Sequence, residues 1–228
     1  LQAQLPYTDE VNPFIGTGGH GHTFPGPTLP FGMVQLSPDT RLTGWDGCSG
    51  YHYSDTIVYG FSHTHLSGTG VSDYGDILLM PFTGAVRFHN GADGRPGYRS
   101  PFSKANEQAE PAYYHTILDD YGIDVELTTT LRAGLHRYTF PAEETPQVML
   151  DLAHRDEVIS SSLRRISDTE WEGSRISQAW AEEQHVYFVI RFSRPVERYL
   201  TQLDGRLLDA QEAAGHSIKA VFAFPESE

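Results

Sequence analysis

The chain of 228 residues is 39% hydrophobic and 20% charged, and its 30 acidic against 16 basic residues give a formal net charge of −14. This size and apolar content exclude a chain that is disordered throughout, because such a chain can bury a sizeable core. The acidic balance, with Lys104 and Lys219 as the only lysines, argues against nucleic-acid binding, which needs clustered cationic side chains.

The start of the chain and its cysteine content leave the compartment open. Residues 1–4 show no charged segment followed by an apolar one, so we interpret them as the trimmed end of a processed or engineered terminus. No apolar run approaches the roughly 20 residues that span a bilayer, so no transmembrane segment is expected. Cys48 is the only cysteine, which excludes an intramolecular disulfide.

Residues 12–80 are rich in turn-forming residues. They hold 13 of the 22 glycines and 5 of the 11 histidines, with aromatic residues between them and little sustained periodicity. Such sequence is typical of loops joined by short extended pieces. We interpret residues 90–111 as a long connection.

The second half of the chain predicts β-structure. Apolar and polar residues alternate there with a period of two, which indicates strands buried on one face. The clearest runs cover residues 123–131, 148–152, 186–192 and 218–224. Two further segments, 156–165 and 207–214, are predicted as short helices near the lower length limit for helix stability. We therefore predict an all-β, mostly antiparallel fold, a large sandwich with few short helices, in one domain over residues 1–228.

The first candidate site segment, residues 16–26, has the sequence GTGGHGHTFPG. Phosphate-binding loops also use glycines, but this run lacks their Lys-Ser/Thr pair, and its prolines prevent a helix from following. Nucleotide binding is therefore disfavoured. We expect a tight backbone path beside a cleft, which presents the two histidines and Phe24 on turns. A structural loop whose histidines bond backbone carbonyls is the alternative.

The second segment, residues 44–53, has the sequence GWDGCSGYHY. An exposed Trp45 beside Asp46 is a common way to hold a sugar, because the indole stacks on the apolar face of the ring while the carboxylate bonds two hydroxyls. The alternative is a core tryptophan beside a turn aspartate. The flanking glycines weaken that alternative, but the residues alone leave both open.

The third segment, residues 61–70, has the sequence FSHTHLSGTG and is followed by Asp73 and Asp76. Residues two apart in a strand share a face, so His63 and His65 could face one metal ion, with the aspartates as further ligands. Buried histidines bonded to neighbouring hydroxyls are favoured over this metal site. A Ser-His-Asp catalytic site is disfavoured, because no G-x-S-x-G motif occurs.

Four ordered runs of unusual composition stand out when these segments are taken together. They are VNPFIGTG at 11–18, PFGMVQLSPDT at 30–40, GWDGCSGYH at 44–52 and GFSHTHLSG at 60–68. These runs resemble the N-terminal domain of glycoside hydrolase family 92. The resemblance covers about residues 11–81 in motif form, and the β-rich remainder agrees with that domain in length and texture.

The resemblance implies exo-acting, inverting α-mannosidases that depend on calcium and are periplasmic, cell-surface or secreted proteins. In that family an N-terminal β-sandwich packs on a larger C-terminal (α/α)6-barrel-like domain, and the active site lies between them. The catalytic acid and base and most calcium ligands come from the C-terminal domain, so we expect no catalytic residue and no metal ligand in this chain. The expected partners are a mannose-containing glycan and the C-terminal domain of the same polypeptide.

The acidic residues of the chain agree with that expectation. Inverting hydrolysis needs two carboxyl groups roughly 6.5–9.5 Å apart, and no pair here can be defended from the sequence. Calcium prefers six to eight oxygen ligands, and no compact loop of alternating Asp and Asn occurs.

The resemblance also suggests substrate-binding residues. Trp45 is the best match to a tryptophan of the family's leaving-group subsite, and Asp46 and the backbone of Gly47 are expected to bond sugar hydroxyls. The expected pocket-wall residues are Cys48, His20 and Phe24. Cys48 is expected to pack there rather than to act as a nucleophile, because no cationic neighbour in the sequence favours a thiolate. We expect His63 and His65 to be structural.

Three hypotheses for function follow. The leading one is the substrate-binding and domain-interface half of an α-mannosidase, inactive alone, which predicts an exposed apolar patch where the other domain packs. The second is a free-standing carbohydrate-binding module with a self-contained aromatic platform. The third is a metal-dependent hydrolase in which His63, His65 and an aspartate face one metal ion.

Overall fold

The computed structural model describes residues 7–68 and 70–226, and the interpretation of residues 1–4 lies outside them. The described part is all-β, and its seventeen strands pair only in antiparallel fashion, which confirms the predicted fold class. The helical pieces there are the 3-10 turns η1 (Tyr7–Glu10), η2 (Trp45–Gly47) and η3 (Lys104–Asn106). Among these residues no helix has the length and apolar character to cross a membrane.

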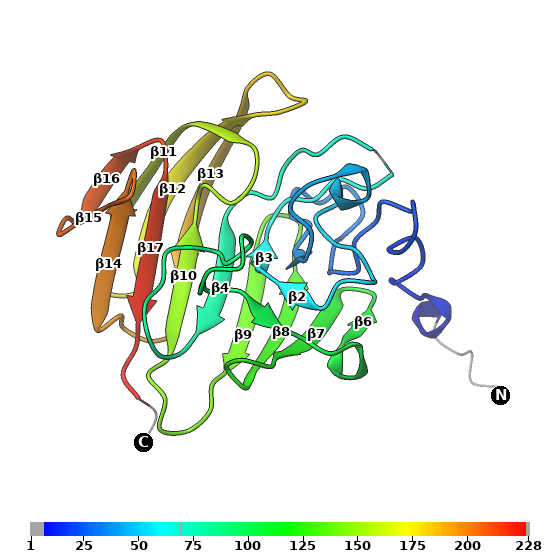
Figure 1. Cartoon of the computed structure of the whole chain (residues 1–228), viewed down its shortest axis with the longest axis horizontal. Helices are drawn as coiled ribbons and strands as arrows, with labels where there is room; N and C mark the ends of the chain where they lie inside the picture. The colour runs from blue at the N-terminus through cyan, green and yellow to red at the C-terminus, as the bar shows by residue number, and fades with distance from the viewer. Residues whose placement is uncertain (1–6, 69, 227–228) are drawn as a thin grey trace.

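Three sheets make up most of the molecule (Figure 1). The central sheet contains, in spatial order, β1 (Ser37–Asp39), β3 (Gly60–Ser62), β4 (Leu78–Phe82), β10 (Gln147–Asp151), β17 (Ile218–Ala223), β14 (Arg198–Leu203) and β15 (Arg206–Leu208). The second sheet contains β13 (Gln184–Arg191), β12 (Glu170–Gln178), β11 (Glu157–Arg165) and β16 (Glu212–Gly215). The third contains β6 (Gln108–Glu110), β7 (Tyr113–Leu118), β8 (Ile123–Thr129) and β9 (Gly134–Thr139). A separate pair consists of β2 (Ile57–Val58) and β5 (Ser100–Pro101).

The second and third sheets cover opposite faces of the central sheet. Along β10, Met149 joins a core with residues of the third sheet such as Val125. Its neighbours Val148 and Leu150 join a different core with residues of the second sheet such as Trp171. Successive residues of a strand point to opposite faces, so the middle of the central sheet is buried on both sides. Its strands β4 and β10 are accordingly buried at every position.

The four strands predicted from alternation are confirmed. They correspond to β8, β10, β13 and β17. In β8 the residues Ile123, Val125 and Leu127 are buried while those between them are partly exposed, which is the alternation that predicted the strand.

The two predicted helices, over residues 156–165 and 207–214, are wrong. The first segment is β11, which pairs with β12 on one side and β16 on the other. Its β-branched residues and three consecutive serines favour a helix only weakly, so pairing with neighbouring strands decides its conformation. The second segment contains the end of β15 and most of β16. The connection predicted at 90–111 is not wholly irregular, because it contains β5, η3 and β6.

The glycine-rich loops within residues 7–68 and 70–76 lie together beside the strands, in the blue and cyan part of the molecule (Figure 1). They are tied to the central sheet by β1 and β3, which pair with each other, and by β4, which pairs with β3. The layered sheets therefore provide a rigid support on which these loops are held.

Candidate functional site

Three glycine-rich segments that are distant in the sequence meet at Trp45 and Asp46. One carboxylate oxygen of Asp46, Oδ1, lies 2.7 Å from Nδ1 of His20 and 3.2 Å from Nε2 of His22. This pairing joins the first candidate segment to the second. The amide of Gly68 donates a hydrogen bond of 2.8 Å to the carbonyl of His22 and so adds the third. The structure therefore brings together the three segments that sequence analysis singled out separately.

The path of these loops requires glycine at two close approaches. A Cβ atom at Gly21 would lie 1.9 Å from the carbonyl oxygen of Gly16, which leaves no room for a side chain. Gly50 has φ of +82°, and a Cβ atom there would lie 2.4 Å from a carboxylate oxygen of Asp39. This backbone region is readily accessible only to glycine. The glycines thus allow the tight packing that brings the segments together.

Asp46 is held as an ionised acceptor. The hydrogen bond from His20 lowers the pKa of its carboxyl below the ordinary value, and the contact with His22 acts in the same direction. Both histidines approach Oδ1, and the Asp46 side chain remains partly exposed. An ionised carboxylate with accessible oxygen can accept hydrogen bonds from hydroxyl groups of a ligand.

Trp45 is an exposed aromatic ring with a defined position. It is 64% exposed, so the alternative of a core tryptophan is not what the structure shows. The ring of His22 meets it edge to face, with 5.3 Å between centroids. On another side it lies against Gly70, where an added Cβ atom would come within 2.1 Å of the indole. An exposed indole beside an ionised carboxylate is an arrangement suited to a pyranose ring.

Gly47 and Cys48 directly follow Trp45 and Asp46 in the chain. Both are buried, and the Gly47 amide donates to the carbonyl of Gly44 at 3.1 Å. The carbonyl oxygens of Gly47 and Cys48 lie 3.2 and 3.5 Å from Nη2 of Arg155. Burial raises the pKa of the Cys48 thiol, although Arg155 acts in the opposite direction. The structure therefore keeps Cys48 as a packed thiol.

The other two predicted wall residues differ in their surroundings. His20 is exposed and bonds Asp46, so it lies at the rim of the candidate site. Phe24 is partly buried, packs on the core that faces the third sheet, and lies 5.2 Å from the ring of His65 between centroids. Direct contact of Gly47, Cys48, His20 or Phe24 with a ligand stays a prediction.

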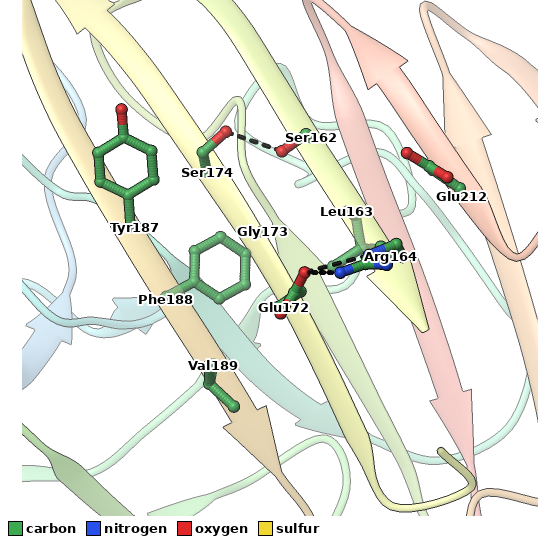
Figure 2. Close-up of a pocket in the computed structure, with 10 residues that line it drawn as sticks. All are labelled: Ser162, Leu163, Arg164, Glu172, Gly173, Ser174, Tyr187, Phe188, Val189 and Glu212. Atoms are coloured by element: carbon green, nitrogen blue, oxygen red, sulfur yellow. Dashed lines mark hydrogen bonds and ion pairs between the residues drawn. The ribbon is translucent and has the colours of Figure 1, made fainter. Parts of the chain in front are cut away.

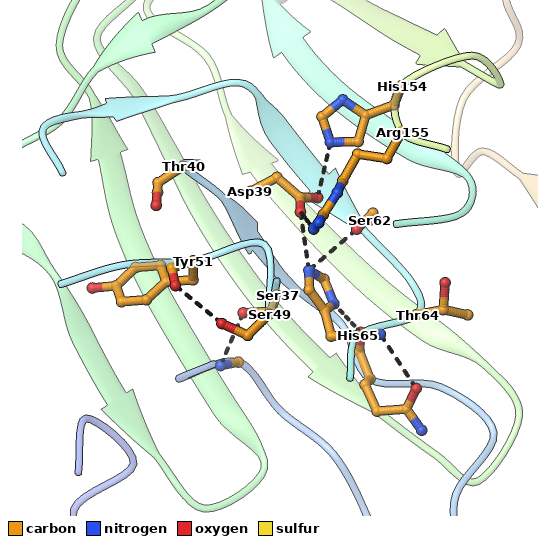
Figure 3. Close-up of polar contacts among 12 residues, drawn as sticks. Ser37, Asp39, Thr40, Ser49, Tyr51, Ser62, Thr64, His65, His154 and Arg155 are labelled. Atoms are coloured by element: carbon orange, nitrogen blue, oxygen red, sulfur yellow. Dashed lines mark hydrogen bonds and ion pairs between the residues drawn. The ribbon is translucent and has the colours of Figure 1, made fainter. Parts of the chain in front are cut away.

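A buried polar cluster centred on Asp39 supports these loops (Figure 3). One carboxylate oxygen of Asp39 lies 3.2 Å from Nε2 of His65, and the other lies 3.5 Å from Nε2 of His154. Burial alone would raise the pKa of Asp39, but His65 and His154 outweigh it and hold the pKa well below its ordinary value. Asp39 thus stays ionised beside the loop that carries Gly50.

His63 and His65 do not face a common ligand position. Nδ1 of His63 lies 2.6 Å from the carbonyl oxygen of Ile77, and its Nε2 lies 3.0 Å from Nε2 of His136. Burial lowers the pKa of His63 to about 4, so the ring is neutral at pH 7. His65 uses Nδ1 for the carbonyl of Gln35 and Nε2 for Asp39 and a serine hydroxyl. These contacts agree with the structural roles expected for both histidines.

The two aspartates near these histidines are engaged elsewhere. Asp73 accepts hydrogen bonds from the amides of Tyr74 and Ala181, at 3.1 and 3.0 Å. Asp76 forms a buried ion pair with Arg175. Within residues 7–68 and 70–226, no group of three or more His, Cys, Asp and Glu side chains is placed to hold a metal ion.

A separate groove lies on the second sheet, on the face turned away from the central sheet (Figure 2). It has a volume of about 560 Å³ and includes the hydrogen-bonded pair Ser162 and Ser174 and the ion pair Arg164 and Glu172. None of the predicted site residues lines it. The groove is therefore distinct from the site around Trp45.

The raised pKa of Asp156 leads us to expect that stability depends on pH. Burial raises its pKa to about 6, and its buried Oδ2 has no hydrogen-bond partner in the structure. A pKa above the unfolded value of 3.8 means that folding favours the protonated form, so the stability present below about pH 4 is lost as pH rises through 6. At pH 7 we expect Asp156→Asn to raise the unfolding free energy by about 1–2 kcal/mol. This value is smaller than the pKa shift alone would give, because Asp156 is partly exposed and solvent screens its charge.

Urea unfolding at pH 4 and pH 7 checks this prediction. The gain in stability should be present at pH 7 and nearly absent at pH 4. The exposed Asp209→Asn is the matched control and should change little at either pH. An equal effect of Asp156→Asn at both pH values would contradict the assignment of a raised pKa.

Two residues close to this site, Arg155 and Ser72, were not singled out from the sequence. Arg155 contacts the turn that carries Trp45 and Asp46, and it also bonds Ser72. The polar run of His154, Arg155 and Asp156 shortly after the buried strand β10 was the available signal, because such residues are seldom buried without a specific partner. Which partner they meet depends on packing between segments about 100 residues apart.

Comparison with known proteins identifies relatives of the whole chain. Residues 10–228 match the family model of the glycosyl hydrolase family 92 N-terminal domain. The chain is 33% identical over 156 residues to an uncharacterized secreted glycosidase of Arthroderma benhamiae, a match that covers 65% of this chain and 20% of that protein.

Solved structures give the same result. A family GH92 α-mannosidase from Bacteroides thetaiotaomicron, solved in complex with mannoimidazole, is 38% identical, with a TM-score of 0.90 over 96% of this chain. An inverting family GH92 mannosidase from the same organism is 26% identical, with a TM-score of 0.83 over all of this chain. In both cases the chain spans only 30% of the length of the matched protein.

Proposed function

Because this chain belongs to glycoside hydrolase family 92, we propose that it is the substrate-binding and domain-interface half of a calcium-dependent, inverting exo-α-mannosidase. Its role is to present Trp45 and Asp46 to the terminal mannose residues of a glycan, at the junction with a C-terminal catalytic domain of the same polypeptide. The enzyme acts in the periplasm, at the cell surface or after secretion, and one relative is named as a secreted glycosidase.

The observation that carries this proposal is the pairing of an exposed indole with an ionised carboxylate. Trp45 offers an apolar face to the sugar ring, and Asp46, held by His20 and His22, accepts hydrogen bonds from its hydroxyls. Asp46 has a lowered pKa, so it is suited to binding and not to donating a proton to the leaving group.

An exposed apolar patch supports the domain-interface role. Phe31 is fully exposed and has φ of +59°, a strained conformation for an aromatic residue. Its neighbour Met33 donates a backbone hydrogen bond of 2.8 Å to the carbonyl of Leu131, and both of these side chains are more than half exposed. Burial against another domain offsets the cost of such a strained, exposed cluster, whereas a free-standing binding module gains nothing from it.

The chemical step then belongs to the other domain. Inverting hydrolysis uses one carboxylic acid to protonate the leaving oxygen and one carboxylate to activate water on the opposite face of the sugar. In this proposal both groups, and most of the calcium ligands, lie outside the present chain. In this proposal the chain contributes to sugar binding and to the exclusion of water.

Hydrolysis assays test the proposal. We expect the complete protein to hydrolyse α-1,2-linked mannobiose in the presence of calcium, and the chain of residues 1–228 alone to be inactive. Activity of the short chain would refute the proposed division between the domains. Mannose binding by the short chain, with no hydrolysis by the complete protein, would favour a free-standing carbohydrate-binding module.

A further inference from the structure

Arg155 is a buried cation that neither the sequence motifs nor the proposed sugar contacts include. It lies in the connection between β10 and β11 and is only 5% exposed. A charged side chain is rarely buried unless it has specific partners, because its removal from water is costly. Its partners therefore indicate what it does.

The guanidinium group of Arg155 contacts two segments that both lie against Trp45. On one side its Nη2 lies 3.2 Å from the carbonyl oxygen of Gly47, in the turn that carries Trp45. On the other side the same nitrogen bonds the hydroxyl of Ser72. Ser72 lies two residues after Gly70, whose backbone rests against the indole of Trp45. One cation thus holds the indole turn and the segment that backs the indole.

Arg155 is itself held in place by contacts with the central and second sheets. Its Nη1 lies 4.0 Å from the ionised carboxylate of Asp39, and its aliphatic chain packs against Gly75, where an added Cβ atom would lie 2.7 Å from Cδ. Its backbone carbonyl accepts a hydrogen bond from Arg175 of β12. The group is therefore anchored to the central sheet through Asp39 and to the second sheet through Arg175.

We infer that Arg155 is a positioning residue, which fixes the Trp45 turn and the segment 70–76 relative to each other so that Trp45 and Asp46 are presented to the sugar in one arrangement. This inference rests on the proposed function for its sugar-binding consequence. The positioning of the two segments by Arg155 is a separate statement, and it can be measured without any substrate.

The geometry requires a guanidinium group. Nη2 of Arg155 contacts two carbonyl oxygens and a hydroxyl while Nη1 lies 4.0 Å from a carboxylate, and a planar group with two terminal nitrogens reaches both positions together. Lysine has one ammonium group, which cannot occupy both the Nη2 position between the two segments and the Nη1 position toward Asp39. Arg155→Lys should therefore preserve the fold better than Arg155→Met and still loosen the turn.

Hydrogen exchange of the complete protein tests the positioning directly. In Arg155→Lys we expect amides in peptides covering residues 44–50 and 70–76 to exchange at least tenfold faster than in the wild type. Amides of β8, which lies in another layer, should exchange at the wild-type rate. The exposed Arg191→Met is the control and should leave all of these peptides unchanged. Unchanged exchange at 44–50, or equal acceleration in β8, would overturn the inference.

Kinetics test the consequence for the sugar. In Arg155→Lys the kcat/KM for an α-mannoside should fall at least tenfold, mainly through a higher KM, because the turn binds sugar while the acid and base lie elsewhere. A fall in kcat with unchanged KM would contradict a positioning role in sugar binding. If the wild-type protein hydrolyses no α-mannoside, the proposed function fails, and the exchange result still decides whether Arg155 positions the turn.

Discussion

Replacing Arg175 with methionine is expected to lower the free energy of unfolding by about 3–5 kcal/mol, because it leaves a buried carboxylate without its cation. Arg175 is fully buried on β12 and pairs with the equally buried Asp76. Its Nε also donates to the carbonyl of Leu152 at 2.9 Å, and its Nη2 donates to the carbonyl of Arg155. Its Nη1 also donates to the hydroxyl of Ser177 at 3.0 Å. Methionine has a similar length but donates no hydrogen bond, so four buried acceptors lose a donor.

Urea unfolding of residues 1–228 measures this effect. Arg191→Met is the matched control, because Arg191 forms an exposed ion pair with Glu170 and such pairs contribute only about 0–1 kcal/mol. Adding Asp76→Asn to Arg175→Met should recover more than about 1 kcal/mol relative to the sum of the single changes, since the unpaired charge is then removed. Similar small losses for Arg175→Met and Arg191→Met would contradict the importance of this ion pair.

Period-two alternation predicted strands well where one face of a strand is buried. In β8 and β13 every second residue faces a core, so the pattern is present in the sequence itself. In the central sheet, β4 is buried completely between two cores and is apolar throughout, so it shows no alternation, although β10 and β17 of the same sheet were predicted. The short strands β1 and β3, of three residues each, are too short to show any period.

The error at β11 has a related cause. Its inner positions include Ser161 and Leu163, and its other positions include Ser162 and Arg164, so polar residues occur on both faces. Ser161 can be buried because its hydroxyl reaches the carbonyls of Gly215 and His216, at 3.2 and 3.0 Å. The sequence does not show whether such a serine is buried, because its partners lie far away along the chain. The period-two pattern of a strand was therefore hidden, and the segment was predicted as a short helix.

The candidate site was predictable where its residues are close in sequence. Trp45 and Asp46 stand side by side among glycines, a local pattern that suggested an exposed indole but left a core tryptophan open, and the structure shows the indole exposed. The pairing of Asp46 with His20 and the contact of Trp45 with Gly70 depend on how separate loops pack, which no local pattern contains. Arg155 is the extreme case, since it lies more than 100 residues from the turn that it supports.

The contact between Gly70 and Trp45 gives the second large expected effect. In the complete protein, Trp45→Ala should lower the kcat/KM for an α-mannoside by about 10- to 100-fold, or about 1.4–2.7 kcal/mol, through loss of the stacking surface. Gly70→Ala should approach the same loss without removing the indole. The added Cβ atom would lie 2.1 Å from the ring, so the ring must leave its position.

The effect of Gly70→Ala on folding should be small, which separates it from a general defect. The clash is with the tip of an exposed ring that can swing into solvent, so we expect the unfolding free energy to change by less than about 1 kcal/mol. Tyr187→Ala is the matched control for Trp45→Ala, because Tyr187 is an exposed aromatic residue on β13, outside the site, and its loss should leave kcat/KM unchanged. If Gly70→Ala retains wild-type kcat/KM while Trp45→Ala does not, the sugar contact depends on the indole but not on the position that Gly70 allows it to take.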